Sequence, residues 1–252
     1  TKYLPLPKAI LMKRTINPFW LLYLVLVFLP LGAFVTVVAS ILTIIFSFIG
    51  DYRWCYMPAK YWGRILCYLS FVRVDVIGRS NYDTNQSYIF VANHQSIYDI
   101  FVLYGWLINK FKWIMKNSLR KIPFVGFACH KAGHIFIDRS NPIRAKRSID
   151  EAEKKLRNGS SIVIFAEGSR TKTGRLGAFK RGAFKIAEDL RLPIVPVSIE
   201  GAFDVLPASS YYVRPERITV TFHEPIDTQD LDRSNMDEFI LRTRAAIESR
   251  LA

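Results

Sequence analysis

The sequence lacks the short motifs that mark several common enzyme classes. It contains no G-x-S-x-G nucleophile elbow, no G-x-G-x-x-G turn, no Walker A pattern and no H-E-x-x-H. These absences disfavour a serine hydrolase, a nucleotide-binding enzyme and a zinc protease, because each class depends on that arrangement to place its nucleophile, phosphate or metal.

Cysteine is scarce. The chain has Cys55, Cys67 and Cys129, an odd number, with no C-x-x-C pair. This disfavours a disulfide framework and a structural zinc site and fits a reducing compartment. His130 and His134 are four residues apart but lack a third ligand, so we predict no metal site. A thiol enzyme using Cys129 is disfavoured, because sequence neighbours seldom form a catalytic pair.

Charge is absent from one long segment near the N-terminus. No charged side chain occurs from Pro18 to Gly50, and four basic residues precede this segment with no acid before Asp51. Such a run is typical of a membrane segment, and it is too long for the apolar core of an ordinary signal peptide. The flanking positive charges favour the cytoplasmic face of the inner (plasma) membrane.

The apolar run is too long for a simple span. As one helix it would measure about 50 Å, against ~30 Å for the hydrocarbon core. Because Pro30 and Gly32 interrupt it, we expect two short helices, Pro18–Leu29 and Ala33–Gly50. They could form a helical hairpin in one leaflet, or the second could cross the membrane.

Basic residues outnumber acidic ones, giving a formal charge of +14. An excess of this size indicates an acidic partner: nucleic acid, an anionic lipid surface or a phosphorylated substrate. Together with the apolar segment, it favours membrane lipids over nucleic acid.

Beyond the apolar segment, short β-branched runs alternate with helical stretches, which predicts an α/β fold with a mostly parallel sheet of about seven strands flanked by helices. We therefore expect an anchoring segment, residues 1–50, and one catalytic domain, residues 51–252. The predicted strands are Phe71–Ile77, Tyr88–Ala92, Lys112–Lys116, His134–Ile137, Ile162–Phe165, Ile194–Ile199 and Arg217–Phe222. The predicted helices are Ile97–Asn109, Pro142–Arg157, Ala178–Arg191 and Met236–Leu251.

The segment Asn93–Asp99 (NHQSIYD) carries the strongest chemical signal. It follows an apolar strand and opens a helix, with Ser96 as the expected N-cap and Asp99 three residues later. His94 and Asp99 can then meet. A carboxylate on one imidazole nitrogen raises the basicity of the other, as a general base requires. The alternative is that Asp99 only caps the helix and His94 is a loop residue.

Charged residues also follow three other predicted strands. Lys116 ends one strand, Asp138 and Arg139 follow the next, and Glu167–Arg170 follows a third. Ligands of open parallel sheets bind beyond the carboxyl ends of the strands. A His–Asp pair and three cations at one edge suit a phosphate beside a reacting hydroxyl. Taken singly, each cation could be an ordinary exposed charge.

Four blocks, in order, resemble the lysophosphatidic acid acyltransferase family, the glycerolipid acyltransferases with an H-x4-D motif. They are Asn93–Asp99, Gly133–Arg139 (GHIFIDR), Phe165–Arg170 (FAEGSR) and Ile194–Val197 (IVPV). A single H-x4-D motif is weak evidence, whereas four ordered blocks over about a hundred residues are specific. The third block commonly has proline before the glutamate, where this chain has Ala166.

The resemblance implies roles for these residues. His94 would be the general base and Asp99 its partner, while Lys116 and Arg170 would hold the acceptor's phosphate. The remaining acceptor-binding residues would be Arg139, Glu167, Gly168 and Ser169. The donor would be a thioester, acyl-CoA or acyl-ACP, with no bound cofactor.

The sequence is compatible with three functions. Lysophosphatidic acid is the first choice of acceptor, and lyso forms of amino-acid-containing lipids are the second. The rival from another class is a basic, non-enzymatic membrane lipid-binding protein, which would explain the charge and the apolar segment.

Overall fold

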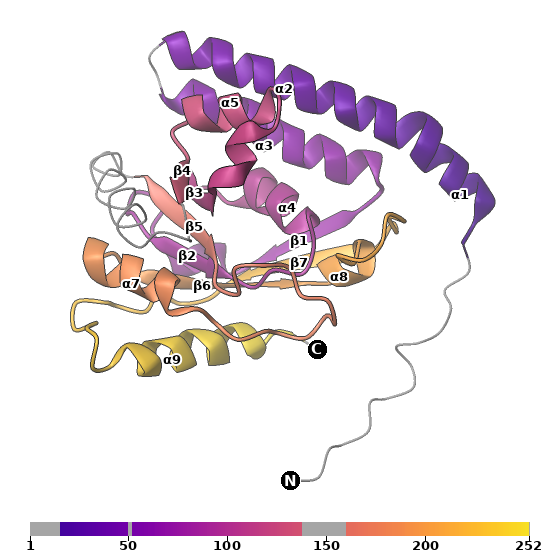
Figure 1. Cartoon of the computed structure of the whole chain (residues 1–252). Coiled ribbons are helices and arrows are strands. Elements are labelled where there is room, and N and C mark those ends of the chain that lie inside the picture. Colours follow the sequence, from indigo (N-terminus) through magenta and orange to yellow (C-terminus); the bar gives the residue numbers. More distant parts are fainter. Residues whose placement is uncertain (1–15, 50–51, 138–159, 252) are drawn as a thin grey trace, which may run out of the picture.

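The fold is built on a seven-stranded sheet (Figure 1). A computed structural model describes residues 16–49, 52–137 and 160–251. The strand order is β1-β7-β6-β2-β5-β3-β4. The strands are β1 (Arg73–Ile77), β2 (Ile89–Ala92), β3 (Phe111–Lys116), β4 (Ile135–Ile137), β5 (Ser161–Phe165), β6 (Ile194–Glu200) and β7 (Arg217–Phe222).

All seven predicted strands are present, and the sheet is mostly parallel, which confirms the predicted α/β class. Among the strands of the described residues, the antiparallel neighbours are β6 and β7. Strands β2 to β6 run in one direction, so their carboxyl ends meet at one edge, while β1 and β7 point the other way. The predicted site residues that lie within the described part of the chain are therefore brought to a common edge of the sheet.

Helices cover both faces of the sheet (Figure 1). Alternate residues of β2 point into the two cores: Phe90 and Ala92 toward α3 and α4, and Ile89 and Val91 toward α7 and α9. Burial on both faces explains why the strands are continuously apolar. The helices of the first face are α3 (Tyr52–Leu69), α4 (Tyr98–Trp106) and α5 (Val125–Lys131), and those of the second are α7 (Arg181–Leu190) and α9 (Met236–Glu248).

Three of the four predicted helices appear in shortened form as α4, α7 and α9. The predicted helix Pro142–Arg157 lies outside the described residues. The described residues also form three short elements, η3 (Arg79–Asn81), η4 (Asn117–Lys121) and α8 (Ala202–Val205).

The expected break at Pro30 is wrong. The chain forms one continuous helix from Pro18 to Ile49, made of α1 (Pro18–Tyr23), the π-helical turn η2 (Leu24–Phe28) and α2 (Leu29–Ile49). Proline lacks an N–H and crowds the preceding turn. Here the wider turn comes directly before it, where the Leu29 N–H reaches back five residues to the Leu24 carbonyl. Such local π adjustments let an apolar helix continue through proline.

A helical hairpin does form, but with other arms than predicted. Its second arm is α3, which packs back along α2 (Figure 1). Trp62 Nε1 donates a hydrogen bond to Thr36 Oγ1 at 2.9 Å, and Tyr23 donates to the Leu69 carbonyl at 2.8 Å. Among the described residues, Pro18–Ile49 is the one helix long and apolar enough to cross a membrane.

Candidate active site

His94 and Asp99 meet at the end of β2. His94 Nδ1 lies 2.7 Å from Asp99 Oδ2, with Asp99 fully buried and the His94 side chain 14% exposed. A carboxylate accepts only, so Nδ1 carries the proton and Nε2 is left as the basic nitrogen. The pair has the geometry that a general base requires.

The same carboxylate also holds the backbone that leads into helix α4. Asp99 Oδ2 accepts the backbone N–H groups of Gln95 at 2.6 Å and Ser96 at 2.8 Å. The Tyr98 N–H in turn reaches Ser96 Oγ at 3.3 Å. The helix begins at Tyr98, so its N-cap residue is Ile97 and the expectation of Ser96 is one residue early. Orienting the imidazole and holding the preceding backbone turn are therefore compatible roles of one carboxylate. The amides of Gln95 and Ser96 are already engaged, so they are poor candidates for stabilising an oxyanion.

The plane of the His94 ring is set by Phe165, the last residue of β5. The two rings stack with centroids 3.8 Å apart and an interplanar angle of 5°. Trp113 continues the stack on the other side of Phe165, at 5.2 Å. Sequence reasoning missed this contact, because it depends on the pairing of β2 with β5.

The Glu167 carboxylate binds the backbone of His94 and of a later loop. Its Oε1 accepts the His94 backbone N–H at 2.8 Å, and its Oε2 accepts the Gly177 N–H at 2.7 Å. A Cβ at position 177 would lie 2.7 Å from the same Oε2, so glycine allows this close approach. The carboxylate thus joins the backbone at His94 to the loop of residues 170–180, which carries Arg170, Lys172, Arg175 and Lys180. This geometry favours a positioning role for Glu167, whereas the resemblance implied acceptor binding.

Helix α9 holds the far side of that loop. The Arg244 guanidinium donates to the carbonyls of Gly177 at 2.5 Å and Leu176 at 3.3 Å. A continuous hydrogen-bonded path therefore runs from Arg244 through the Gly177 peptide and Glu167 to the His94 backbone. Sequence reasoning missed Arg244, because nothing local to α9 indicates its partner.

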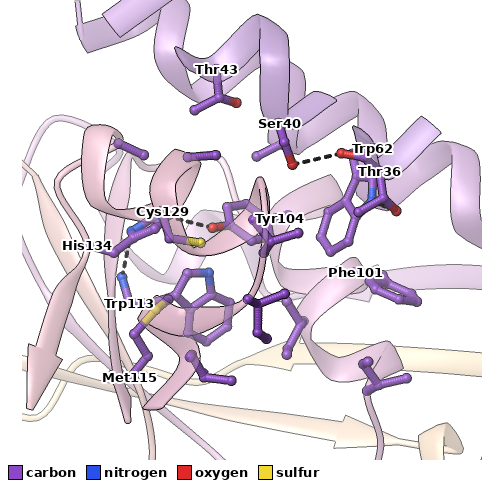
Figure 2. A pocket seen from close by; sticks show the side chains of 18 of the residues that line it. Thr36, Ser40, Thr43, Trp62, Phe101, Tyr104, Trp113, Met115, Cys129 and His134 are labelled. Carbon is purple, nitrogen blue, oxygen red and sulfur yellow. Dashed lines mark hydrogen bonds between the residues drawn. The ribbon is translucent and has the colours of Figure 1, made fainter. Parts of the chain in front are cut away.

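A cavity of about 780 Å³ opens beside His94 and runs between the sheet and the α2–α3 hairpin (Figure 2). Its walls come from α2, α3, α4, β3, η4 and α5. Most lining side chains are apolar or aromatic, among them Ala39, Ala59, Trp62, Ile97, Ile100, Phe101, Trp113, Ile114, Met115, Leu119, Ile122, Val125 and Ala128. The volume and character suit one long hydrocarbon chain.

Charged and polar groups also line this cavity. Lys116, Gly168, Ser169 and Arg170 line it together with His94, and Lys116 and Arg170 are exposed. The structure therefore brings together five of the predicted site residues around one opening, with Asp99 and Glu167 behind them. Arg139 lies outside the described residues.

Ala166 occupies the position where proline is common in the resembled family. Its backbone N–H donates to the Ala92 carbonyl at 3.1 Å, and its own carbonyl accepts the Lys180 N–H at 2.9 Å. Proline could not make the first of these bonds. The hydrogen bond extends the β2–β5 pairing by one residue. It holds the start of the loop, a role that the rigid proline ring would have in the resembled family.

The wall away from His94 includes a buried polar pair. The Trp113 backbone N–H donates to His134 Nδ1 at 3.2 Å, so Nε2 carries the proton and donates to the Tyr104 hydroxyl at 2.7 Å (Figure 2). Burial, helped by the nearby Lys112 ammonium, lowers the pKa of His134 to about 3. The imidazole is therefore neutral at physiological pH and serves as a structural group.

Comparison with known proteins agrees with this geometry. The model of the family described as Acyltransferase matches residues 73–200, which include His94, Asp99 and the Phe165–Arg170 turn. The chain is 40% identical over 159 residues to 1-acyl-sn-glycerol-3-phosphate acyltransferase of Cocos nucifera, covering 62% of this chain and 51% of that protein. It is 31% identical over 228 residues to the yeast protein of that name, covering 87% and 73%.

A solved structure extends the likeness beyond the matched domain. The 1-acyl-sn-glycerophosphate acyltransferase PlsC of Thermotoga maritima is 27% identical, with a TM-score of 0.76, covering 92% of this chain and 95% of that chain. The chain spans about half the length of the plant relatives. With half of its residues matched by the family model and its His–Asp pair in place, the chain belongs to the Acyltransferase family.

Proposed function

We propose that this protein transfers a fatty acyl group from a thioester, acyl-CoA or acyl-ACP, to the free sn-2 hydroxyl of lysophosphatidic acid, giving phosphatidic acid. The observation that carries the proposal is the His94–Asp99 pair at the opening of an apolar cavity, beside Lys116 and Arg170. The cavity offers room for a fatty chain, and the two cations offer a phosphate site. Relatives that bear the name of this reaction support it.

The proposed reaction needs no covalent intermediate. His94 Nε2 takes the proton of the acceptor hydroxyl while the hydroxyl oxygen bonds to the carbonyl carbon of the thioester. The tetrahedral adduct then collapses, the C–S bond breaks, and the thiolate takes the proton from the imidazolium. A thiol is far more acidic than an alcohol, so it leaves readily. Asp99 stabilises the imidazolium that forms between the two proton transfers.

Membrane attachment is part of the proposal. We propose that residues 1–50 anchor the protein to an anionic, cytoplasmic membrane face and that residues 51–252 form the catalytic domain. The apolar helix Pro18–Ile49 and the basic composition support this arrangement. The anchor forms part of the cavity wall through Thr36, Ala39, Ser40 and Thr43, so anchoring and substrate binding would be coupled.

The test is an acyl-transfer assay with purified full-length protein in phospholipid vesicles. We expect the wild type to form phosphatidic acid from lysophosphatidic acid, and His94→Ala to lose turnover while still binding vesicles. Supplying acyl-CoA and acyl-ACP in parallel identifies the donor. A wild type inactive on every acceptor would favour the lipid-binding alternative, and turnover by His94→Ala would exclude the proposed base.

A second variant tests the choice of acceptor. If Arg170 binds the phosphate, Arg170→Ala should raise KM for lysophosphatidic acid about ten- to a hundredfold, the loss of one charge-assisted contact. Arg242→Ala, an exposed arginine on α9, is the matched control. An unchanged KM in Arg170→Ala, together with turnover of lyso amino-acid lipids, would transfer the proposal to those acceptors.

A further inference from the structure

The η4–α5 segment, residues 117–131, exposes large apolar side chains beside the cavity. Leu119, Ile122, Phe124 and Phe127 are 42%, 43%, 55% and 50% exposed. Leu119 and Ile122 also line the cavity, so this segment is the wall between the cavity and the outside. We call these four side chains the apolar patch. Large apolar side chains clustered in one exposed segment of a folded protein mark a contact surface.

This patch is continuous with the exposed face of the long apolar helix. Helix α5 packs against α2, as Figure 1 shows. The Lys131 ammonium lies over two exposed rings, 4.4 Å from the centroid of Phe48 on α2 and 5.5 Å from that of Phe127 on α5. Whatever surface covers the end of α2 therefore also meets α5.

The charge of the segment identifies the surface. Residues 110–137 contain no Asp or Glu, and Arg120, Lys121 and Lys131 accompany the apolar side chains of the patch. Apolar side chains with flanking cations are typical of elements that dip into an anionic membrane surface, where the cations reach the headgroups. A second protein would need a complementary acidic face, whereas the membrane already adjoins α2 in the proposed arrangement.

The backbone at Phe124 is held in an unfavourable conformation that presents the ring outward. Its φ and ψ are 58° and −56°, and the Val125 N–H bonds back to the Pro123 carbonyl at 2.6 Å, a tight γ-turn. This turn is rare and strained for a residue other than glycine. This strained turn places an exposed aromatic side chain, Phe124, within the patch.

We propose that η4–α5 is a second membrane-inserting element, which enters the same leaflet as Pro18–Ile49 and opens the cavity wall directly to the bilayer. Phe124 and Phe127 insert, Arg120, Lys121 and Lys131 bind anionic headgroups, and Leu119 and Ile122 face lipid on one side and the cavity on the other. A fatty chain then passes sideways between the bilayer and the cavity without crossing water. This inference rests on the proposed function, since it supplies the route for that function's lipid substrates.

The direct test places a tryptophan in the patch. Phe127→Trp is compared with the parent protein in vesicles of phosphatidylcholine and phosphatidylglycerol with plain or brominated acyl chains. We expect the added emission to be quenched by brominated lipid. Leu241→Trp, exposed on α9 on the opposite side of the sheet, is the control and should not be quenched. The proposal would be overturned if the extra fluorescence of Phe127→Trp over the parent protein were equal in plain and brominated vesicles. That is the result expected if a second copy of the chain covered the patch.

The second measurement compares the kinetics of one variant on a vesicle-bound and a monomeric substrate. Phe124→Asp combined with Phe127→Asp should lower kcat/KM for vesicle-bound lysophosphatidic acid by at least about tenfold, since each buried phenylalanine contributes that much to partitioning. Activity on a short-chain lysolipid kept monomeric in solution should be unchanged. Equal losses on both substrates would overturn the proposal. If quenching is seen but no acceptor is acylated, the membrane contact stands and the proposed reaction fails.

Discussion

Asp99 holds the His94 imidazole with the same oxygen that receives the Gln95 and Ser96 amides at the start of α4. The position of the proposed base is thereby coupled to the first turn of a helix. Changing this one carboxylate should affect both catalysis and local structure.

Asp99→Asn removes the negative charge of this side chain but keeps its shape. The amide still fills the site, but it no longer stabilises the imidazolium and can hold His94 in the wrong tautomer. We expect kcat to fall about 10²- to 10⁴-fold with KM for the acceptor nearly unchanged. Steady-state kinetics on vesicles measures this, and near wild-type turnover would show that Asp99 acts only by holding the Gln95 and Ser96 backbone.

Glu167→Gln distinguishes positioning from acceptor binding. One amide oxygen can still accept a backbone N–H, but the amide nitrogen would face the other N–H, donor against donor. Because the carboxylate joins the His94 and Gly177 backbones, we expect kcat to fall and KM for the acceptor to change little. A raised KM with unchanged kcat would instead support the acceptor-binding role implied by the family resemblance.

Gly63 sets the distance between α3 and α4, the helix that carries Asp99. A Cβ at this position would lie 2.4 Å from the Phe101 carbonyl oxygen, so the backbones would have to separate. Gly63→Ala should lower the free energy of unfolding by about 1–3 kcal/mol, as overpacking does, and reduce kcat.

Gly182 on α7 is the matched control for Gly63. An added Cβ there meets no atom within 4 Å, and Gly182→Ala should leave stability unchanged or raise it by up to about 1 kcal/mol. Thermal and denaturant unfolding of the two variants compare them directly. Equal stability of both would show that α3 and α4 can readjust.

His134 predicts a specific acid sensitivity. The unfolded chain binds a proton at this imidazole near pH 6.5, whereas the native state does so only near its pKa of about 3. Between these values the unfolded state holds more protons, so native stability is full above pH 6.5 and falls as pH drops toward 3. His134→Gln should be less stable at neutral pH, because it disturbs two buried hydrogen bonds, but its melting temperature should fall less on acidification.

The control for this prediction is His130→Gln, on the exposed side of α5. Its melting temperature should follow that of the wild type across the same pH range. Identical acid dependence in His134→Gln and the wild type would contradict the assignment of a neutral, buried His134.

Much of the fold could be predicted because its determinants are local. Each apolar β-branched run became a strand, and the order of strands and helices implied a mostly parallel sheet with the chemical residues at strand ends. The sequence predicted that His94, Asp99, Lys116 and Arg170 would lie near one another, since the carboxyl ends of parallel strands must share an edge.

Other features depended on contacts between distant segments. Continuity of the helix through Pro30 rests on the π turn at Leu24–Phe28, and no residue pattern marks such a turn. Phe165 under His94 and Arg244 behind Gly177 depend on which strands and helices pack together.

By itself, the sequence determined the apolar N-terminal segment, the alternation of strands and helices and the His–Asp pair, because spacing and hydropathy act over a few residues. Only the tertiary structure decided that the pair opens into an apolar cavity, that Glu167 binds backbone amides, and that α5 extends the exposed apolar face of α2. Those relationships are set by packing between segments far apart in the chain, where burying apolar surface outweighs local preference.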